Sequence, residues 1–408
     1  MKRASFFFFF KLSAYWFAIN FLWGAMLAIV IPSQVQFIVG NNAKSAVLGS
    51  VIAVGALVAM ISQPVFGALS DRSTLSFGRR RPMMVLGALL TTIPLYIMGT
   101  TSNIIVYSGG FLLLQLFVNI STAGYQGLIP DTVTPAERGI AASFLGIMTF
   151  LGTISAVVLS GSLADQHRYG LINVLIGVVI LATMAVTAFG IKEKPHFNQE
   201  KFNLTTFLKT FYVSPKKHPD FIWLLVASFF IMIGFYTLFN FQQYYLEDIM
   251  GSTHPAQDTT LVSAVVLVGA TLISVVAGVL SDKIGRKKVA SFSALFMATM
   301  AFALLFRPSF QVILVMGVIF GLGYGGFTSV HWALVTDCLP DAEGSAKDLG
   351  LWTVSATLPQ VLGPKIGGYL LAVYHETNLA YGYSLLYVLV IAYLVIGSLL
   401  VFKIKGSR

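Results

Sequence analysis

Hydrophobic positions run along this chain in long, nearly continuous stretches that short polar segments separate. A helix needs about 20 mostly apolar residues to cross a bilayer. Windows of that kind cover residues 14–37, 45–69, 82–100, 103–129, 139–163, 171–191, 220–246, 258–280, 289–306, 310–336, 349–374 and 380–402. The runs are too long for the alternating strands of a membrane β-barrel. The pattern therefore predicts an all-α membrane protein with twelve transmembrane helices.

Composition strengthens this prediction. The chain has 408 residues, of which 56% are hydrophobic and 10% charged, and its mean hydropathy is +0.81. A soluble domain carries roughly 25% charged residues. The start, "MKRASFFFFF", is basic but has no small-residue cleavage site before the apolar run. We interpret it as a retained end that leads into the first helix, not as a signal peptide.

The positions of Lys and Arg predict the orientation in the membrane. If the N-terminus is cytoplasmic, the inner segments carry 22 of the 26 Lys and Arg residues, and the outer loops carry only Lys44, Arg168 and Arg307. By the positive-inside rule, both termini are cytoplasmic, with the cell membrane as the expected location. The net charge of +10 then reflects topology and attraction to inner-leaflet lipids, not nucleic-acid binding. Cys338 is the single cysteine, which excludes disulfides and thiolate metal clusters within the chain.

The chain repeats one plan in its two halves. "GALSDRSTLSFGRRRP" at 67–82 recurs as "GVLSDKIGRKKV" at 278–289, and "PDTVTPAERG" at 130–139 has a looser copy at 336–350. The sequence predicts an N-terminal six-helix bundle in residues 1–191, a cytoplasmic linker in 192–219 and a C-terminal six-helix bundle in 220–408. Such repeats are typical of secondary transporters, whose substrate site lies near the midplane at the repeat interface.

The repeated loop, with G-x-x-S-D-R followed by G-R-R-R-P, resembles the signature loop of the major facilitator superfamily. Within it, "NFLWG", "QPVFGALSDR" and "GRRRP" resemble the sucrose-permease (solute carrier 45) type, and more distantly the glycoside–pentoside–hexuronide cation symporters. The resemblance implies a 6+6 pseudo-symmetric fold that works by alternating access. Gln63 stands where those symporters have a cation-binding Asp, so sodium coupling is disfavoured.

The resemblance also implies a cytoplasmic gate built from the repeated loops. Its candidate residues are Gly67, Asp71, Arg72, Gly78, Arg79, Arg80 and Asp131 in the first half, and Gly278, Asp282, Lys283 and Asp337 in the second. Gly67 would permit close helix approach, and Asp71 would face the partial positive charge of a neighbouring helix N-terminus. The alternative is that these cations only anchor the chain to the inner leaflet.

Polar residues spaced along one face of several predicted helices form the candidate substrate site. They are Asn20, Trp23, Gln63, Gln115, Asn119, Gln126, Tyr236, Asn240, Gln243, His331, Trp332 and Lys365. Amides that donate and accept, together with aromatic faces, suit a neutral polyhydroxylated ligand such as a sugar. The alternative is that these side chains only bond helix to helix, which contributes about 0.6 kcal/mol for each bond.

Lys365 is the one cation inside a predicted helix, where an ammonium at bilayer depth costs at least ~2.5 kcal/mol. It either faces the cavity, as the lysine of the cation symporters does, or snorkels toward the outer interface. No carboxylate occupies a helix centre. If protons are coupled, His331 and Lys365 are the candidate carriers, although His331 is equally interpreted as a packed, hydrogen-bonded residue. Uniport stays an open alternative.

The sequence thus predicts a secondary transporter of a small polar solute, a sugar or glycoside such as sucrose. The alternative is an exporter or flippase of amphipathic or anionic compounds, in which Lys365 would meet a negative headgroup. No D-D-x-x-D, H-x-x-x-H or G-x-S-x-G motif supports a membrane enzyme, and a channel would not need a two-copy gate. We expect a monomer without cofactor or metal, whose partners are its substrate and membrane lipids.

Overall fold

The computed structural model describes residues 5–70, 78–134, 137–193, 218–338 and 345–405, and the structure is helical without strands in these parts of the chain. The longer elements are α1 (Phe6–Ala25), a π-helical turn (Met26–Val30), α2 (Ile31–Ser70), α3 (Arg81–Thr100), α4 (Ile104–Thr132), α5 (Arg138–Asp165), α6 (Tyr169–Gly190), α8 (Pro219–Asp248), α9 (Pro255–Ile284), α10 (Arg286–Leu304), α11 (Phe310–Cys338) and α12 (Ser345–Leu400). The predicted gate residues Asp71 and Arg72, and residues 194–217 of the predicted linker, lie outside the described residues.

Ten helical stretches in the described residues are long and apolar enough to cross a membrane. Two of them hold a break, at Gly40 in α2 and at Asn378 in α12, where the backbone leaves the helical conformation. Counting the two parts of each broken stretch separately gives twelve spans, so the predicted fold class is confirmed. The first break is sharper than expected, because helix resumes right after Gly40 and Lys44 is helical instead of lying in a loop.

Local sequence explains where several of these helices begin. The Ser5 side chain accepts from the backbone N–H of Phe8 and caps α1. Asn103 caps α4 by accepting from the N–H groups of Ile105 and Val106. Such side chains satisfy backbone donors that have no partner within the helix. Pro219 and Pro255 begin α8 and α9, where the missing N–H of proline costs nothing.

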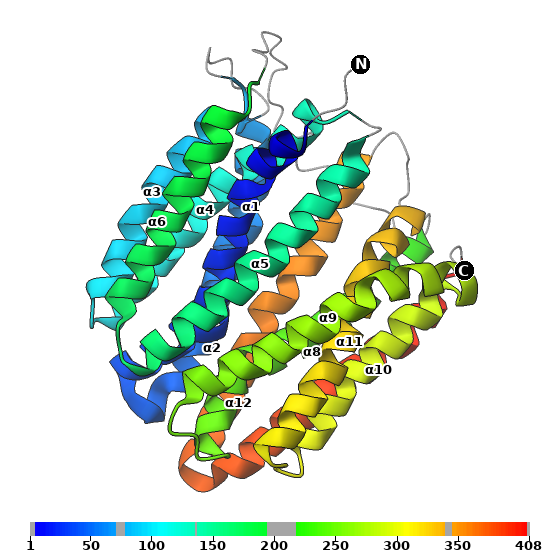
Figure 1. Cartoon of the computed structure of the whole chain (residues 1–408). Helices are drawn as coiled ribbons and strands as arrows, with labels where there is room; N and C mark the ends of the chain where they lie inside the picture. Colours follow the sequence, from blue (N-terminus) through cyan, green and yellow to red (C-terminus); the bar gives the residue numbers. More distant parts are fainter. Residues whose placement is uncertain (1–4, 71–77, 135–136, 194–217, 339–344, 406–408) are drawn as a thin grey trace. The chain divides into compact units, whose positions relative to one another are not determined.

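The chain divides into two compact units, one formed by Met1–Val39 and Val54–Lys201, the other by Gly40–Ala53 and Phe202–Arg408. In the first unit α1 packs against α5 and α6, and α3 packs against α4 and α6 (Figure 1). Buried hydrogen bonds join three of these helices, because Ser121 of α4 contacts the Tyr15 hydroxyl of α1 at 2.5 Å and donates to the Met84 carbonyl of α3 at 2.7 Å.

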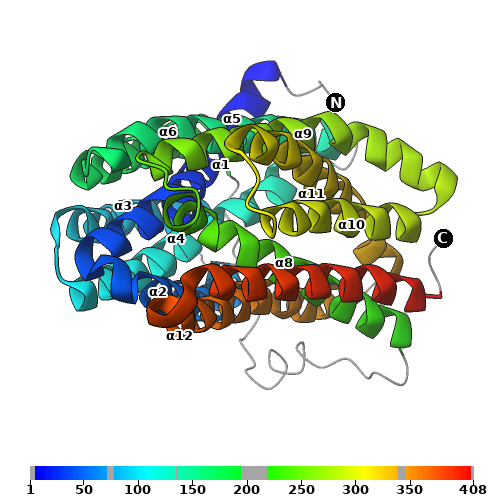
Figure 2. The ribbon, with the colours of Figure 1, turned by 90° about the horizontal axis from the view of Figure 1, so that it is seen from below.

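In the second unit α8 packs against α12, while α10 and α11 lie side by side (Figures 1 and 2). The glycine-rich run of α11 lets it approach α9 closely. A Cβ at Gly321 would overlap the carbonyl oxygen of Val266, and one at Gly325 would overlap that of Ala270. Helices in membranes associate through such small residues, since lipid gives no hydrophobic driving force between them.

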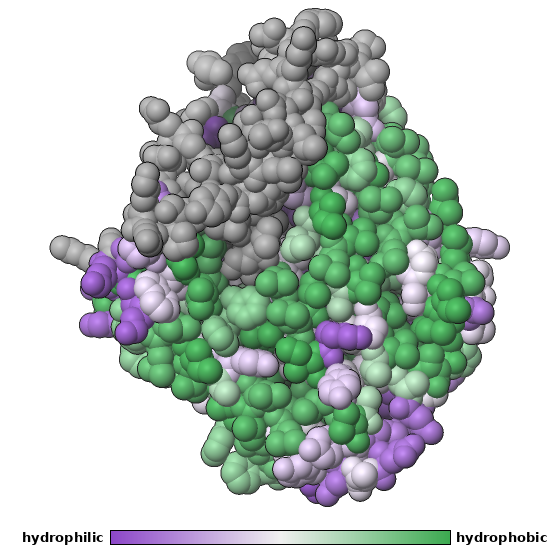
Figure 3. Space-filling view, turned by 180° about the vertical axis from the view of Figure 1, so that it is seen from behind, coloured by the Kyte–Doolittle hydropathy of each residue, from purple (hydrophilic) through white to green (hydrophobic). Residues whose placement is uncertain are grey.

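The described surface carries many large apolar side chains. Figure 3 shows one face, where hydrophobic residues dominate the coloured area and hydrophilic residues gather mainly near its ends. Ile105, Phe189, Phe306, Leu272 and Leu399 are among the side chains more than 60% exposed. A soluble protein rarely exposes apolar patches beyond a few hundred Å². The helices therefore meet lipid, as expected of a multi-pass membrane protein.

Candidate substrate and gate sites

In the first unit, the arginines that precede α3 bind the carboxylate at the end of α4. Arg79 donates to both Asp131 oxygens at 2.8 and 2.7 Å, and Arg80 Nε donates to Asp131 at 3.1 Å. Glu193, just beyond α6, accepts from the backbone N–H groups of Arg80 and Arg81. A carboxylate is favoured at this position, the N-terminus of α3.

Gly78 makes this arrangement of the first unit possible. Its φ of 118° lies in the region that favours glycine, and a Cβ there would overlap the Glu193 carboxylate. The predicted gate residues Gly78, Arg79, Arg80 and Asp131 are thus brought together, with Glu193 added.

The second unit repeats this geometry with Arg286 in place of the expected Lys283. Arg286 donates to Asp337 at 2.5 Å and to the carbonyl of Ala333 at 3.2 Å. Gly285 before it has a φ of 102°, as Gly78 has a positive φ before Arg79. Asp282 lies 3.8 Å from Arg286 and is largely exposed, and Lys283 is exposed. The structure brings Asp337 and Arg286 together and leaves Lys283 at the surface.

Two predicted gate glycines lack the close helix contact expected of them. A Cβ at Gly67 or at Gly278 would meet no atom of the described residues within 4 Å. The expectation that Gly67 permits close helix approach therefore finds no support within the described part of the chain.

Two sets of contacts in the first unit, one aromatic and one between amides, link four helices, and we refer to them together as the aromatic and amide face. Trp16 of α1 stacks on Tyr125 of α4 with 5.9 Å between ring centroids, and its indole N–H donates to Thr149 of α5 at 2.8 Å. Gln63 of α2 donates to Gln126 of α4 at 3.2 Å. Gln126 is exposed and Gln63 half-buried. These amides keep donors and acceptors that can reach a further group.

The other predicted residues of the first unit bond mainly within their own helix. Asn20 donates to the Trp16 carbonyl at 2.7 Å, and Asn119 donates to the Gln115 carbonyl at 2.7 Å. Gln115 and Asn119 are buried, while Asn20 and Trp23 are half-buried. Such intrahelical bonds occupy one donor and leave the remaining groups of the amide for other contacts.

The polar residues of α8 in the second unit are more deeply buried. Asn240 donates to the Tyr236 carbonyl at 2.7 Å, and its side-chain oxygen has no hydrogen-bond partner among the described residues. Gln243 is 1% exposed. The structure thus places Asn240 and Gln243 inside the helical bundle, with an acceptor of Asn240 unused.

His331 of α11 is bonded to α8. Its Nε2 lies 2.7 Å from the Ser228 hydroxyl, and its ring stacks on Phe327 with 4.7 Å between centroids. This is the packed, hydrogen-bonded arrangement that the sequence allowed as the alternative to a role as proton carrier. Trp332, predicted beside it in the site, is 52% exposed.

Lys365 of α12 is exposed, and its Nζ donates to the Ser50 hydroxyl at 2.8 Å. It makes no ion pair with any described carboxylate. Ser50 lies in residues 40–53, which belong to the second unit.

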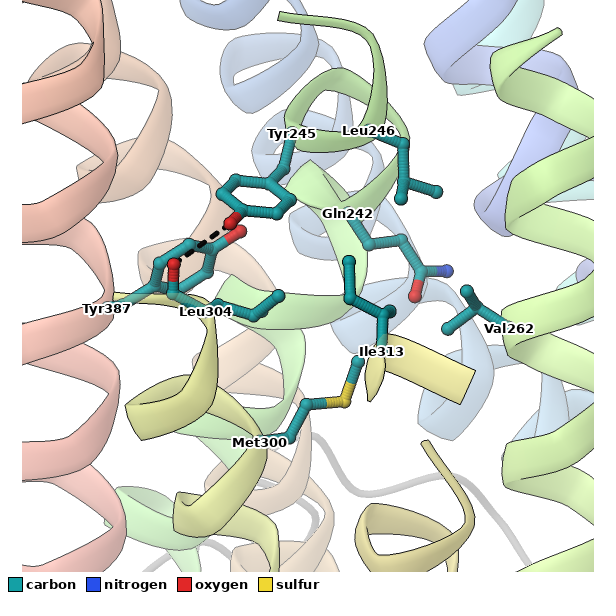
Figure 4. A pocket seen from close by; sticks show the side chains of 8 residues that line it. All are labelled: Gln242, Tyr245, Leu246, Val262, Met300, Leu304, Ile313 and Tyr387. Atoms are coloured by element: carbon teal, nitrogen blue, oxygen red, sulfur yellow. Dashed lines mark hydrogen bonds between the residues drawn. The ribbon is translucent and has the colours of Figure 1, made fainter. Parts of the chain in front are cut away.

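The cavity volume of a small pocket in the second unit is about 10 Å³. Figure 4 shows Tyr245 and Tyr387 side by side on its wall, with the Tyr245 hydroxyl donating to the Leu304 carbonyl at 2.9 Å. Pockets for small-molecule ligands measure about 300–1,000 Å³, so this one is too small for a disaccharide. Among the described residues, no group of three or more His, Cys, Asp or Glu side chains could hold a metal ion.

The family model described as "MFS/sugar transport protein" matches residues 21–404. The chain belongs to this family. This match establishes the predicted membership of the major facilitator superfamily. It also establishes, at the level of the family, the predicted function as a transporter.

Relatives within and around this family include both exporters and sugar permeases. The multi-drug resistance efflux pump PmrA of Streptococcus pneumoniae is 25% identical over 92% of this chain and 94% of its own length. The general alpha-glucoside permease of Schizosaccharomyces pombe is 29% identical, over 36% of this chain and 31% of its own length. The lactose permease of Leuconostoc lactis is 21% identical over 48% of this chain and 34% of its own length.

Solved structures of transporters share the fold of this family member. A bacterial homologue of the human lysosomal transporter Spinster superposes with a TM-score of 0.76 at 14% identity and covers 98% of both chains. The nucleoside transporter NupG gives a TM-score of 0.77 at 14% identity, over 97% of this chain and 99% of its own. At these identities the likeness concerns the fold alone.

Some site residues of this family member were missed by the sequence interpretation. Arg286 is the second-half counterpart of Arg79, and the available signal was the G-R dipeptide to which each of them belongs. Tyr125 lies one residue before Gln126 and therefore off the helix face on which the predicted polar residues of α4 are spaced, so helical spacing did not indicate it. Ser228 and Glu193 act through partners 103 and 113 residues away, for which the sequence offers no local signal.

Proposed function

We propose that this protein is a sugar or glycoside carrier that works by alternating access in the cell membrane, with both termini cytoplasmic. The observation that carries the proposal is the aromatic and amide face of the first unit. Trp16, stacked on Tyr125 and fixed by Thr149, offers a flat apolar surface of the kind that covers a sugar ring. The Gln63–Gln126 amide pair offers donors and acceptors for hydroxyl groups.

The family description and the glucoside and lactose permease relatives support the same substrate class. Proton coupling and uniport are both compatible with the residues. His331 bonds Ser228 and Lys365 donates to Ser50, so a proton gained or lost at either residue would act on an existing hydrogen bond.

Uptake of labelled sucrose by purified protein in liposomes, with and without an inward proton gradient, tests the proposal. The Gln126→Ala variant removes one amide of the face, and Gln311→Ala, at an exposed position of α11, is the matched control. We expect saturable uptake that Gln126→Ala reduces and Gln311→Ala leaves unchanged. Stimulation by the gradient would indicate symport, while uptake indifferent to it would indicate a facilitator. Absence of uptake by folded protein would refute the sugar proposal.

A second candidate is the export of amphipathic or anionic compounds. The alignment with the multi-drug efflux pump favours it, because that alignment covers nearly the whole of both chains. Extrusion of an amphipathic anionic dye from liposomes, weakened in Lys365→Gln, would support this function over sugar uptake.

A further inference from the structure

The small pocket of Figure 4 lies among the helices of the second unit, and its size suits a single water molecule. Its cavity volume is about 10 Å³, at the lower end of the roughly 10–15 Å³ that one buried water needs. Five apolar side chains and three polar ones line it, and they come from α8, α9, α10, α11 and α12. The polar ones are Gln242, Tyr245 and Tyr387. A ligand larger than one water does not fit.

The Tyr387 hydroxyl is the group in this pocket that needs a partner. Tyr387 is 1% exposed, and its hydroxyl has no hydrogen-bond partner among the described residues. Its ring packs edge to face on the Tyr245 ring with 5.2 Å between centroids, which fixes the position of the side chain. A buried hydroxyl that has lost its bonds to bulk water and gained none destabilises the fold. A ligand that accepts a hydrogen bond from Tyr387 removes this cost.

Tyr245 and Gln242 supply acceptors to the same pocket. The Tyr245 hydroxyl donates its proton to the Leu304 carbonyl at 2.9 Å, and its oxygen can still accept. The Gln242 amide nitrogen lies 3.4 Å from the Ser263 hydroxyl, and the amide oxygen is a further acceptor. Figure 4 shows the two tyrosines on one side of the pocket and Gln242 on the other. A water that accepts from Tyr387 and donates to Tyr245 and Gln242 has three partners, the usual number for a buried water.

We propose that this pocket is a binding site for one buried water molecule, which accepts from the Tyr387 hydroxyl and links α12 to α8. The pocket is lined by none of the predicted substrate residues, so the inference goes beyond the proposed carrier function and does not depend on it. The competing state is a dry cavity, which the apolar part of the wall favours. The two states differ in what the Tyr387 hydroxyl contributes, because it stabilises the fold only when it is hydrogen-bonded.

Removal of this hydroxyl by Tyr387→Phe tests the water site through the sign of the change in stability. Thermal unfolding of the full chain in detergent is the measurement, and Tyr381→Phe, at a half-exposed tyrosine of the same helix, is the matched control. With water bound, Tyr387→Phe loses a hydrogen bond, and we expect the unfolding midpoint to fall by about 2 °C. In a dry cavity the same change removes an unbonded hydroxyl, so the midpoint would rise. A rise or an unchanged midpoint would overturn the proposal.

A density map of the unmodified chain, at a resolution that shows ordered waters, is the second measurement and decides the question even if Tyr387→Phe does not fold. We expect an isolated peak in the pocket at about 2.5–3.0 Å from the Tyr387 hydroxyl oxygen, the range of O–H···O hydrogen bonds. The peak should be absent from a map of folded Tyr387→Phe and present in one of Tyr381→Phe. A pocket without density in a map that shows other buried waters would overturn the proposal.

Discussion

Arg286 binds Asp337 across 51 residues of sequence, and Arg79 binds Asp131 across 52. In each half of the chain, an arginine after a positive-φ glycine reaches a carboxylate at the end of the second helix that follows the glycine. The repeat is therefore present in the structure as well as in the sequence. Among the described residues, Asp131 forms ion pairs with Arg79 and Arg80, and Asp337 forms one with Arg286.

The Arg286–Asp337 pair should contribute modestly to stability, since both side chains are about one third exposed. We expect a double-mutant cycle with Arg286→Gln and Asp337→Asn to give a coupling free energy of about 0.5–1 kcal/mol. Thermal unfolding in detergent measures it. A coupling free energy near zero would mean that this ion pair does not contribute to the stability of the folded protein.

Gly78→Ala should destabilise the protein, while Gly67→Ala should not. At Gly78 the backbone φ is 118° and a Cβ meets Glu193, whereas a Cβ at Gly67 meets no described atom. A non-glycine residue in such a conformation costs on the order of 1–3 kcal/mol. The midpoint of thermal unfolding should therefore fall for Gly78→Ala only. Equal midpoints for the two variants would contradict the assigned role of Gly78.

A covalent link between residues 40–53 and α12 should stop transport. Asn42 and His375 contact each other at 3.1 Å, so cysteines at both positions, in a chain with Cys338→Ala, should react with a short bifunctional thiol reagent. We expect quantitative cross-linking to abolish uptake and reduction to restore it, whereas each single cysteine should leave uptake unaffected by the reagent. Full uptake by the cross-linked chain would show that residues 40–53 do not separate from α12 during transport.

Cys338 should react slowly with maleimides at neutral pH. Burial raises the pKa of its thiol from 9.0 to about 11, with a contribution from the nearby carboxylates of Asp220 and Asp337 that Lys287 opposes. The thiolate is the nucleophile, and about two pKa units reduce its fraction about 100-fold.

Alkylation of folded protein should therefore accelerate as the pH rises toward 11, while unfolded protein should reach its plateau above pH 9. Because the folded-state pKa is the higher one, this thiol also costs stability as the pH rises above 9. A plateau near pH 9 in the folded protein would contradict the burial effect.

The sequence by itself determined the class, the spans and the repeat. Helix length across a bilayer is a local property of about 20 consecutive residues, so the windows agree with the helices to within a few residues except at the start of the first. Arg79, Arg80 and Asp131 were predicted as members of one cytoplasmic gate because the repeated loops marked them. The structure places them in contact, and their role as a gate stays a prediction.

Only the tertiary structure decided which polar groups meet. Lys44 was predicted in an outer loop, yet it is buried against carboxylates 203 and 204 residues away. His331 was a candidate proton carrier, and the structure gives it Ser228 as a partner. Hydrophobicity specifies that a residue lies in a helix. The partner of a charge depends on how helices distant in sequence pack, which no local pattern contains.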